Sequence, residues 1–162
     1  MEQKKELDNS EIKDFKQLGE MEAVRKAVEN LPKLNEPKYD LSKYLNNLGD
    51  VSEAGDSKLE SYLAIFTSWQ NYLGVQLRVS EVVKTVAEEQ TKRFYSFAVK
   101  SMLGKNITER KQLAYSDELY LESVSIFNTA KAIHSSVETA FLSCDRAYKA
   151  VSRIVRIREM EK

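Results

Sequence analysis

The sequence predicts an all-α fold: a long, coiled-coil-like antiparallel helical hairpin with a smaller N-terminal helical segment, assembled into an oligomer. Two observations predict the helices. The 162 residues include only two prolines and five glycines, too few for the frequent turns that a sheet needs. In the last third of the chain, apolar residues recur at alternating spacings of four and three, which places them on one stripe of a helix.

This stripe extends from Ser116 to Ile157 and has one polar interruption, Ser123. It is far longer than the helices of about 8–20 residues that ordinary globular proteins contain. It therefore predicts the seam of a coiled coil and leaves little room for a catalytic pocket. Its apolar members are Leu119, Ile126, Ala130, Ile133, Val137, Ala140, Cys144, Ala147, Val151 and Ile154.

Residues 1–56 are expected to form an acidic helical segment followed by a linker. Apolar residues from Ile12 to Leu31 predict a helix that ends before Pro32, because the residue preceding a proline disfavours the helical conformation. A shorter helix is expected over residues 39–48. The stretch Gly49–Asp56 contains two glycines and is expected to be a polar linker.

Residues 57–162 are expected to form a long two-helix domain that mediates oligomerisation and binds nucleic acid. A first helix is predicted over residues 57–103 and a last helix over residues 108–158. Gly104 between them suits the left-handed backbone conformation that stops many helices. Two long helices joined by a short turn form an antiparallel hairpin.

The last helix also carries a second apolar strip, which one partner helix cannot cover. Either the N-terminal helix folds back as a third helix, or the strip associates with further copies of the chain. Exposed apolar strips on long helices favour association, so a homo-oligomer is expected. The strip consists of Tyr120, Val124, Phe127, Phe141, Tyr148 and Val155.

The chain lacks the residue groups that catalysis and metal binding require. Catalysis by nucleophile or by acid and base needs converging groups, such as a histidine with Ser, Cys or a carboxylate. The only histidine, His134, lies on the second apolar strip, and the only cysteine, Cys144, is on the seam and expected to be buried. Metal-ligand clusters and glycine-rich phosphate loops are absent from the sequence. The sequence predicts a protein that is not an enzyme and has no cofactor.

Charge is distributed unevenly along the chain. Residues 1–66 contain ten Lys and Arg against fourteen Asp and Glu, whereas residues 67–162 contain fifteen against eleven. Four of these cations are spaced by three, four and three residues, so they share one face of the last helix: Arg146, Lys149, Arg153 and Arg156. Such a stripe suits a phosphate backbone or an anionic membrane. Alternatively, it is a solvated face that complements the dipole at the end of a helix.

A second basic region combines cations with aromatic residues. Lys92 and Arg93 precede Tyr95 and Lys100, and single-stranded nucleic acid binds where bases stack on rings while cations hold phosphates. The neighbouring Phe94 and Phe97 keep the spacing of core residues, so Tyr95 is the ring expected to be exposed. A structural role for this region is the alternative.

This region resembles the UvsY-type recombination mediators of phages. In that family a tryptophan early in a long helix precedes a Lys-x-Arg motif and paired tyrosines. Here Trp69 is followed after twenty-three positions by Lys92, and Ser152–Arg156 resembles the basic, amphipathic tail of the family's second helix. The resemblance covers roughly residues 57–160. It departs from the family at Phe94, where a second basic residue would fall, and over the acidic N-terminal segment.

The resemblance implies a ring-forming helical oligomer that binds single-stranded DNA through Lys92. Its partners would be a recombinase, which it helps to load, and the single-strand-binding protein that covers the DNA. A cytoplasmic location is expected, that of the host if the chain is phage-encoded, since no apolar run is as long as a membrane span. Two alternatives stay open: a membrane-surface module like a BAR domain, and a purely structural coiled coil.

Overall fold

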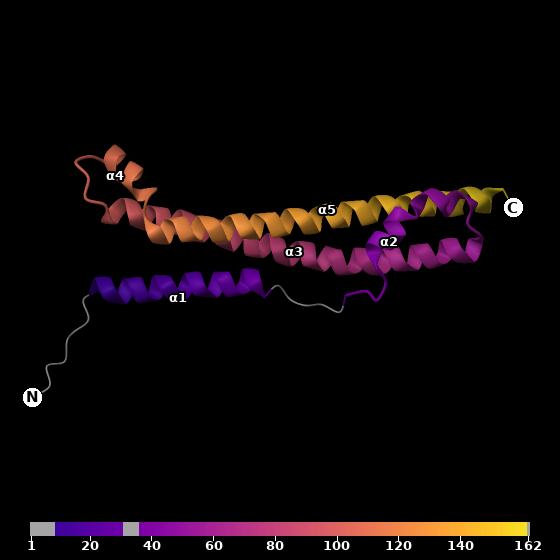
Figure 1. Cartoon of the computed structure of the whole chain (residues 1–162), viewed down its shortest axis with the longest axis horizontal. Coiled ribbons are helices and arrows are strands. Elements are labelled where there is room, and N and C mark those ends of the chain that lie inside the picture. The colour runs from indigo at the N-terminus through magenta and orange to yellow at the C-terminus, as the bar shows by residue number, and fades with distance from the viewer. Residues whose placement is uncertain (1–8, 31–35, 162) are drawn as a thin grey trace, which may run out of the picture. The chain divides into compact units, whose positions relative to one another are not determined.

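The computed structural model describes the backbone of residues 9–30 and 36–161, and within these ranges the side chains of residues 19–30, 36–49 and 51–161. Every regular element in these ranges is helical (Figure 1), so the prediction of an all-α fold is confirmed. The elements in chain order are α1 (Asn9–Glu29), α2 (Leu41–Asn46), a 3₁₀ helix η1 (Leu48–Glu53), α3 (Asp56–Ser101), α4 (Ile107–Ala114) and α5 (Glu118–Met160).

The chain divides into two units, and each of the long helices α3 and α5 contributes to both. Of the residues that the structure describes, the α1 unit comprises 9–30 and 82–131, and the α2 unit comprises 36–81 and 132–161. In the α2 unit, Cys144 contacts the carbonyl of Phe66, whereas Ser80, further along α3, contacts the earlier residue His134. The two helices therefore run antiparallel, as the hairpin prediction requires.

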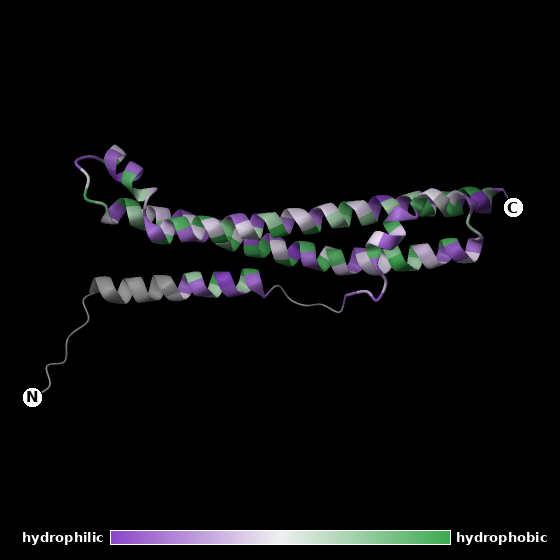
Figure 2. Cartoon of the chain, viewed as in Figure 1, coloured by the Kyte–Doolittle hydropathy of each residue, from purple (hydrophilic) through white to green (hydrophobic). Residues whose placement is uncertain are grey.

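The α2 unit contains a core of large apolar side chains. The predicted seam of α5 faces this core, because Cys144, Ala147 and Val151 are fully buried. Figure 2 shows apolar residues recurring along both long helices, as amphipathic helices require. The buried members of α3 are Leu59, Tyr62, Ile65, Phe66, Trp69 and Leu73.

The expected polar linker over Gly49–Asp56 is wrong. Most of this stretch is the helix η1, and Val51 is only 1% exposed within the core of the α2 unit. Ala54 is buried beside it. The glycines suggested a loop, but the two apolar residues between them are spaced by three, which matches the 3₁₀ repeat.

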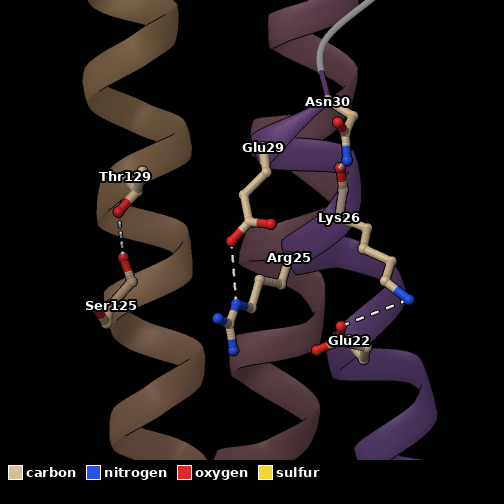
Figure 3. A network of polar contacts seen from close by, with 7 residues as sticks. All are labelled: Glu22, Arg25, Lys26, Glu29, Asn30, Ser125 and Thr129. Atoms are coloured by element: carbon tan, nitrogen blue, oxygen red, sulfur yellow. Dashed lines mark hydrogen bonds and ion pairs between the residues drawn. The ribbon is translucent and has the colours of Figure 1, made fainter.

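In the α1 unit, the N-terminal helix lies against the hairpin as a third helix. Met21, Val24 and Val28 are buried at spacings of three and four, and the side chain of Gln90 on α3 donates to the carbonyl of Glu20 at 3.2 Å. Figure 3 shows α1 alongside α5, with Arg25 of α1 paired to Glu29 at 3.1 Å. The fold-back alternative therefore describes α1 in this unit.

The prediction of one continuous last helix over residues 108–158 is wrong. The chain forms the short helix α4, turns over residues 115–117, and starts α5 at Glu118. Successive amides bond to carbonyls three residues earlier, ending with Asp117 N–H to Ala114 O at 3.2 Å. The Asp117 carboxylate then accepts from the amide of Tyr120 at 2.9 Å. An aspartate in that position starts a new helix, although no glycine or proline marks the break.

Gly104 has a different role from the expected left-handed stop. No glycine in the described ranges has a positive φ. A Cβ at this position would lie 2.8 Å from Arg110 Cγ and 3.0 Å from the Arg110 amide nitrogen. The glycine is therefore needed because α4 approaches it closely. The amide of Glu109 is capped by Asn106 at 2.9 Å, and the Glu109 carboxylate accepts from the amide of Lys105 at 2.7 Å, an arrangement similar to a capping box.

Candidate nucleic-acid interface

The basic stripe of α5 lies in the α2 unit, and all four of its side chains are exposed: Arg146, Lys149, Arg153 and Arg156. Lys149 forms an ion pair with Asp145 at 2.6 Å, one turn earlier on the same helix. The three arginines form no ion pair with any other residue of the described ranges. Three guanidinium groups on one helix face are therefore available to anions from solution.

Arg158, two residues beyond the stripe, shows how an arginine with a structural role is held. Its guanidinium donates to the carbonyls of Ala54 at 2.6 Å and Ser52 at 2.8 Å, and it pairs with Asp56 at 3.2 Å. These contacts tie the end of α5 to the start of α3 and to the end of η1. Its side chain is 28% exposed. The arginines of the stripe have no such partners among the described residues, so they do not link elements of the fold as Arg158 does.

The second predicted region lies in the α1 unit, on α3. Lys92 forms an ion pair with Glu88 at 2.7 Å, and this hydrogen bond raises the pKa of the lysine. Exposed pairs at this spacing contribute little to stability, so Lys92 remains able to exchange its partner. Arg93 and Lys100 are exposed and have no ion pair within the described part of the chain.

Tyr95 is half-buried in a cluster with two tyrosines that the sequence did not assign to a site. Its ring centroid lies 5.3 Å from that of Tyr115 and 5.4 Å from that of Tyr120. Hydrogen bonding to Tyr115 raises the pKa of Tyr95. The expectation that Tyr95 is the exposed ring and Phe97 a core residue is wrong, since Phe97 is 44% exposed. Phe94 is buried as predicted. The break before α5 brings Tyr115 to the cluster.

The cluster borders a surface cavity of about 160 Å³. Thr91 lies at this cavity and links the two long helices, because the single hydrogen of its hydroxyl is shared between the carbonyl of Ser123 at 3.1 Å and that of Ala87 at 2.9 Å. The cavity thus joins aromatic faces, a lysine and a fixed hydroxyl. Its lining residues are Thr91, Lys92, Tyr95, Tyr115 and Tyr120.

His134 connects a serine and a glutamate in the α2 unit. Its Nδ1 lies 3.1 Å from Ser80 Oγ, and its Nε2 lies 2.9 Å from Glu81 Oε2. The Ser80 hydroxyl donates to the carbonyl of Leu77 at 3.0 Å, and the residue as a whole is only 1% exposed. A hydroxyl that is bonded to the backbone and closed to solvent is not a usable nucleophile. The trio cross-links α3 and α5.

Cys144 is buried, as expected, and its thiol contacts the carbonyl of Phe66 at 3.4 Å. Burial, with a smaller contribution from Asp145, raises the pKa of the thiol to about 11. A neutral, enclosed thiol is a poor nucleophile. Among the residues that the structure describes, no three His, Cys, Asp or Glu side chains gather into a metal site.

None of the described helices is sufficiently long and apolar to cross a lipid bilayer. Comparison of the chain with protein-family models, curated proteins and solved structures finds no match. The resemblance to the recombination mediators therefore stays a prediction.

Proposed function

We propose that this protein is a non-enzymatic, oligomeric accessory factor that binds single-stranded DNA, with a role like that of the phage recombination mediators. One observation carries the proposal: Arg146, Arg153 and Arg156 are exposed on one face of α5 without a carboxylate partner among the described residues. Arginine binds phosphate through a planar fork of donors. A strand running along α5 would meet these forks in succession.

The helix dipole does not account for the stripe. Its effect falls off within the last turn of a helix, and α5 ends at Met160. Arg146 and Arg153 lie well before that turn. Arg158, which is in it, already has its own carboxylate and carbonyl partners. An external anionic partner explains the position of the stripe better.

Self-association would compensate for the modest charge of each copy. Repeating a weak basic patch around an oligomer raises the overall affinity for a long polyanion without any strong single site. Exposed apolar side chains support association: Val82 on α3 is 62% exposed, and Leu142 and Ile157 on α5 are also exposed. We propose that the assembled protein acts in the cytoplasm on DNA covered by a single-strand-binding protein and helps a recombinase to replace it.

Binding of labelled oligo(dT) over a series of salt concentrations tests the proposal. The wild-type chain should bind at micromolar concentration or below in low salt. A triple variant, Arg146→Gln with Arg153→Gln and Arg156→Gln, should bind more weakly. The slope of log K against log salt should fall in magnitude by about 2, because each phosphate contact on a single strand contributes roughly 0.7.

A matched variant removes the same charge elsewhere: Lys26→Gln with Lys43→Gln and Lys58→Gln, three exposed lysines outside the two predicted regions. This variant should bind oligo(dT) with the affinity of the wild type. If it loses as much affinity as the arginine variant, the assignment of DNA binding to the stripe is refuted. If the protein leaves the mobility of labelled oligo(dT) unchanged, DNA binding is refuted. Sedimentation of the protein with anionic vesicles would then identify lipid as the ligand. Light scattering with and without oligo(dT) measures assembly, and a monomer in both would contradict the oligomer.

A further inference from the structure

The break between α4 and α5 creates a site that a continuous helix would not have. Tyr115 follows the last residue of α4, and its ring lies 5.9 Å from that of Tyr120 at the start of α5. Tyr95 of α3 completes the set. Tyr115 is 58% exposed, so one ring of the cluster offers a face to solvent while the other two are half-buried.

The cavity beside these rings suits a flat, uncharged ring system next to an anion. Its walls are the three tyrosines, and Lys92 and Thr91 complete them. Glu88, the partner of Lys92, does not line it. Its volume of about 160 Å³ is well below the roughly 300–1,000 Å³ of sites for drug-sized ligands. A single aromatic ring system is the ligand of matching size.

We propose that this cavity holds one unpaired nucleobase, stacked on Tyr115, while Lys92 contacts the adjoining phosphate. This inference rests on the proposed function. It adds a contact to the bases of the single-stranded DNA to the contacts with its phosphates. Bases stack on aromatic side chains in sequence-tolerant fashion, because every base has a π-face. Lys92 can meet the phosphate by exchanging its exposed partner Glu88.

Two probes of equal length and charge separate bases from phosphates: oligo(dT) and an abasic deoxyribose-phosphate oligomer. Tyr115→Ala should weaken binding of oligo(dT) roughly 5- to 150-fold, the range found for loss of one stacked base. Its binding of the abasic oligomer should not change. Tyr115→Phe keeps the stacking face and should restore oligo(dT) binding. Lys92→Gln should weaken binding of both probes.

A matched control is Tyr39→Ala, which removes a tyrosine of similar exposure, 55%, from the α2 unit. It should bind both probes like the wild type, and circular dichroism should show that both alanine variants keep their helix content. Equal affinity of the wild type and Tyr115→Ala for oligo(dT) would overturn the base site and leave the proposed function standing. Failure of the wild type to bind either probe would overturn the proposed function itself.

Discussion

The two units use side chains of different size where α3 meets α5. In the α2 unit, the fully buried side chains include Leu59 and Phe66 on α3 and Val151 on α5. In the α1 unit, four of the five buried residues of these helices are small, and the set consists of Ala87, Phe94, Ala98, Ser123 and Ala130. The buried side chains of α3 and α5 are therefore mostly large in the α2 unit and mostly small in the α1 unit, where Ala87, Ala98, Ser123 and Ala130 form a small-residue seam.

The small-residue seam permits a close approach of the two helices. The hydroxyl of Thr91 reaches the backbone carbonyl of Ser123 on the opposite helix at 3.1 Å, which a larger neighbour would prevent. Less apolar area is buried by alanines than by Leu, Phe and Trp, so each residue of this seam contributes less to stability. The tyrosine cluster belongs to the same unit. The basic stripe of α5 instead belongs to the α2 unit, together with the core of large side chains.

The largest effect expected from this comparison is the loss of a core side chain in the α2 unit. Phe66→Ala should lower the free energy of unfolding by about 3–5 kcal/mol, because it removes a fully buried ring and leaves a cavity. Urea denaturation measures this change. Phe97→Ala makes the same substitution at a 44% exposed site of the α1 unit and should cost under about 1 kcal/mol. Equal losses would mean that Phe66 is not enclosed in the core of the α2 unit as its burial indicates.

A smaller effect is expected from overpacking the small-residue seam. Ala98→Leu places three further carbons at a buried site and should lower the free energy of unfolding by about 1–3 kcal/mol. The control is Ala150→Leu, at an exposed position of α5, which should change stability little. If Ala98→Leu is instead neutral or stabilising in urea denaturation, the seam has space to spare and its small residues are not required for close packing.

The sequence predicted the helices well where a single periodicity continues over many residues. The seam of α5 is an example, since its members are buried or half-buried from Leu119 to Ile154. It predicted poorly where the structure depends on local bonding. The turn before Asp117 arises from amides that bond three residues back and from a new helix cap. The apolar seam begins only at Leu119, after this turn, and so does not mark it.

The candidate site was also predictable only in part, because periodicity places some of its residues and local backbone bonding places the others. The cations of the α5 stripe share a helix face, and spacing alone places them. Tyr115 joins Tyr95 only because the chain turns after α4, so a continuous helix could not predict the pair. The signal that could have indicated it is Asp117, a residue type that favours helix starts. Arg158 was assigned no role from the sequence, because its structural role depends on partners far away along the chain, in and just after η1 and at the start of α3.

The smallest effect concerns Cys144 in the dense core of the α2 unit. The pKa of this thiol is about 11 in the folded chain and 9.0 as its ordinary value, chiefly because burial disfavours the thiolate. Since the folded pKa is the higher one, the contribution of the thiol to stability is complete below about pH 9. It is lost as the pH rises towards 11. Between pH 8.5 and 9.5 this loss amounts to about 1 kcal/mol or less.

Urea denaturation of the wild type and of Cys144→Ala at these two pH values isolates the contribution of the thiol. Both chains keep the same tyrosines and lysines, so the titration of those groups cancels in the difference. Between pH 8.5 and 9.5, the free energy of unfolding should fall more for the wild type than for Cys144→Ala, by the contribution of the thiol given above. An identical pH dependence in the two chains would mean that solvent reaches the thiol, and the packing of large side chains around Cys144 would then be looser than its burial indicates.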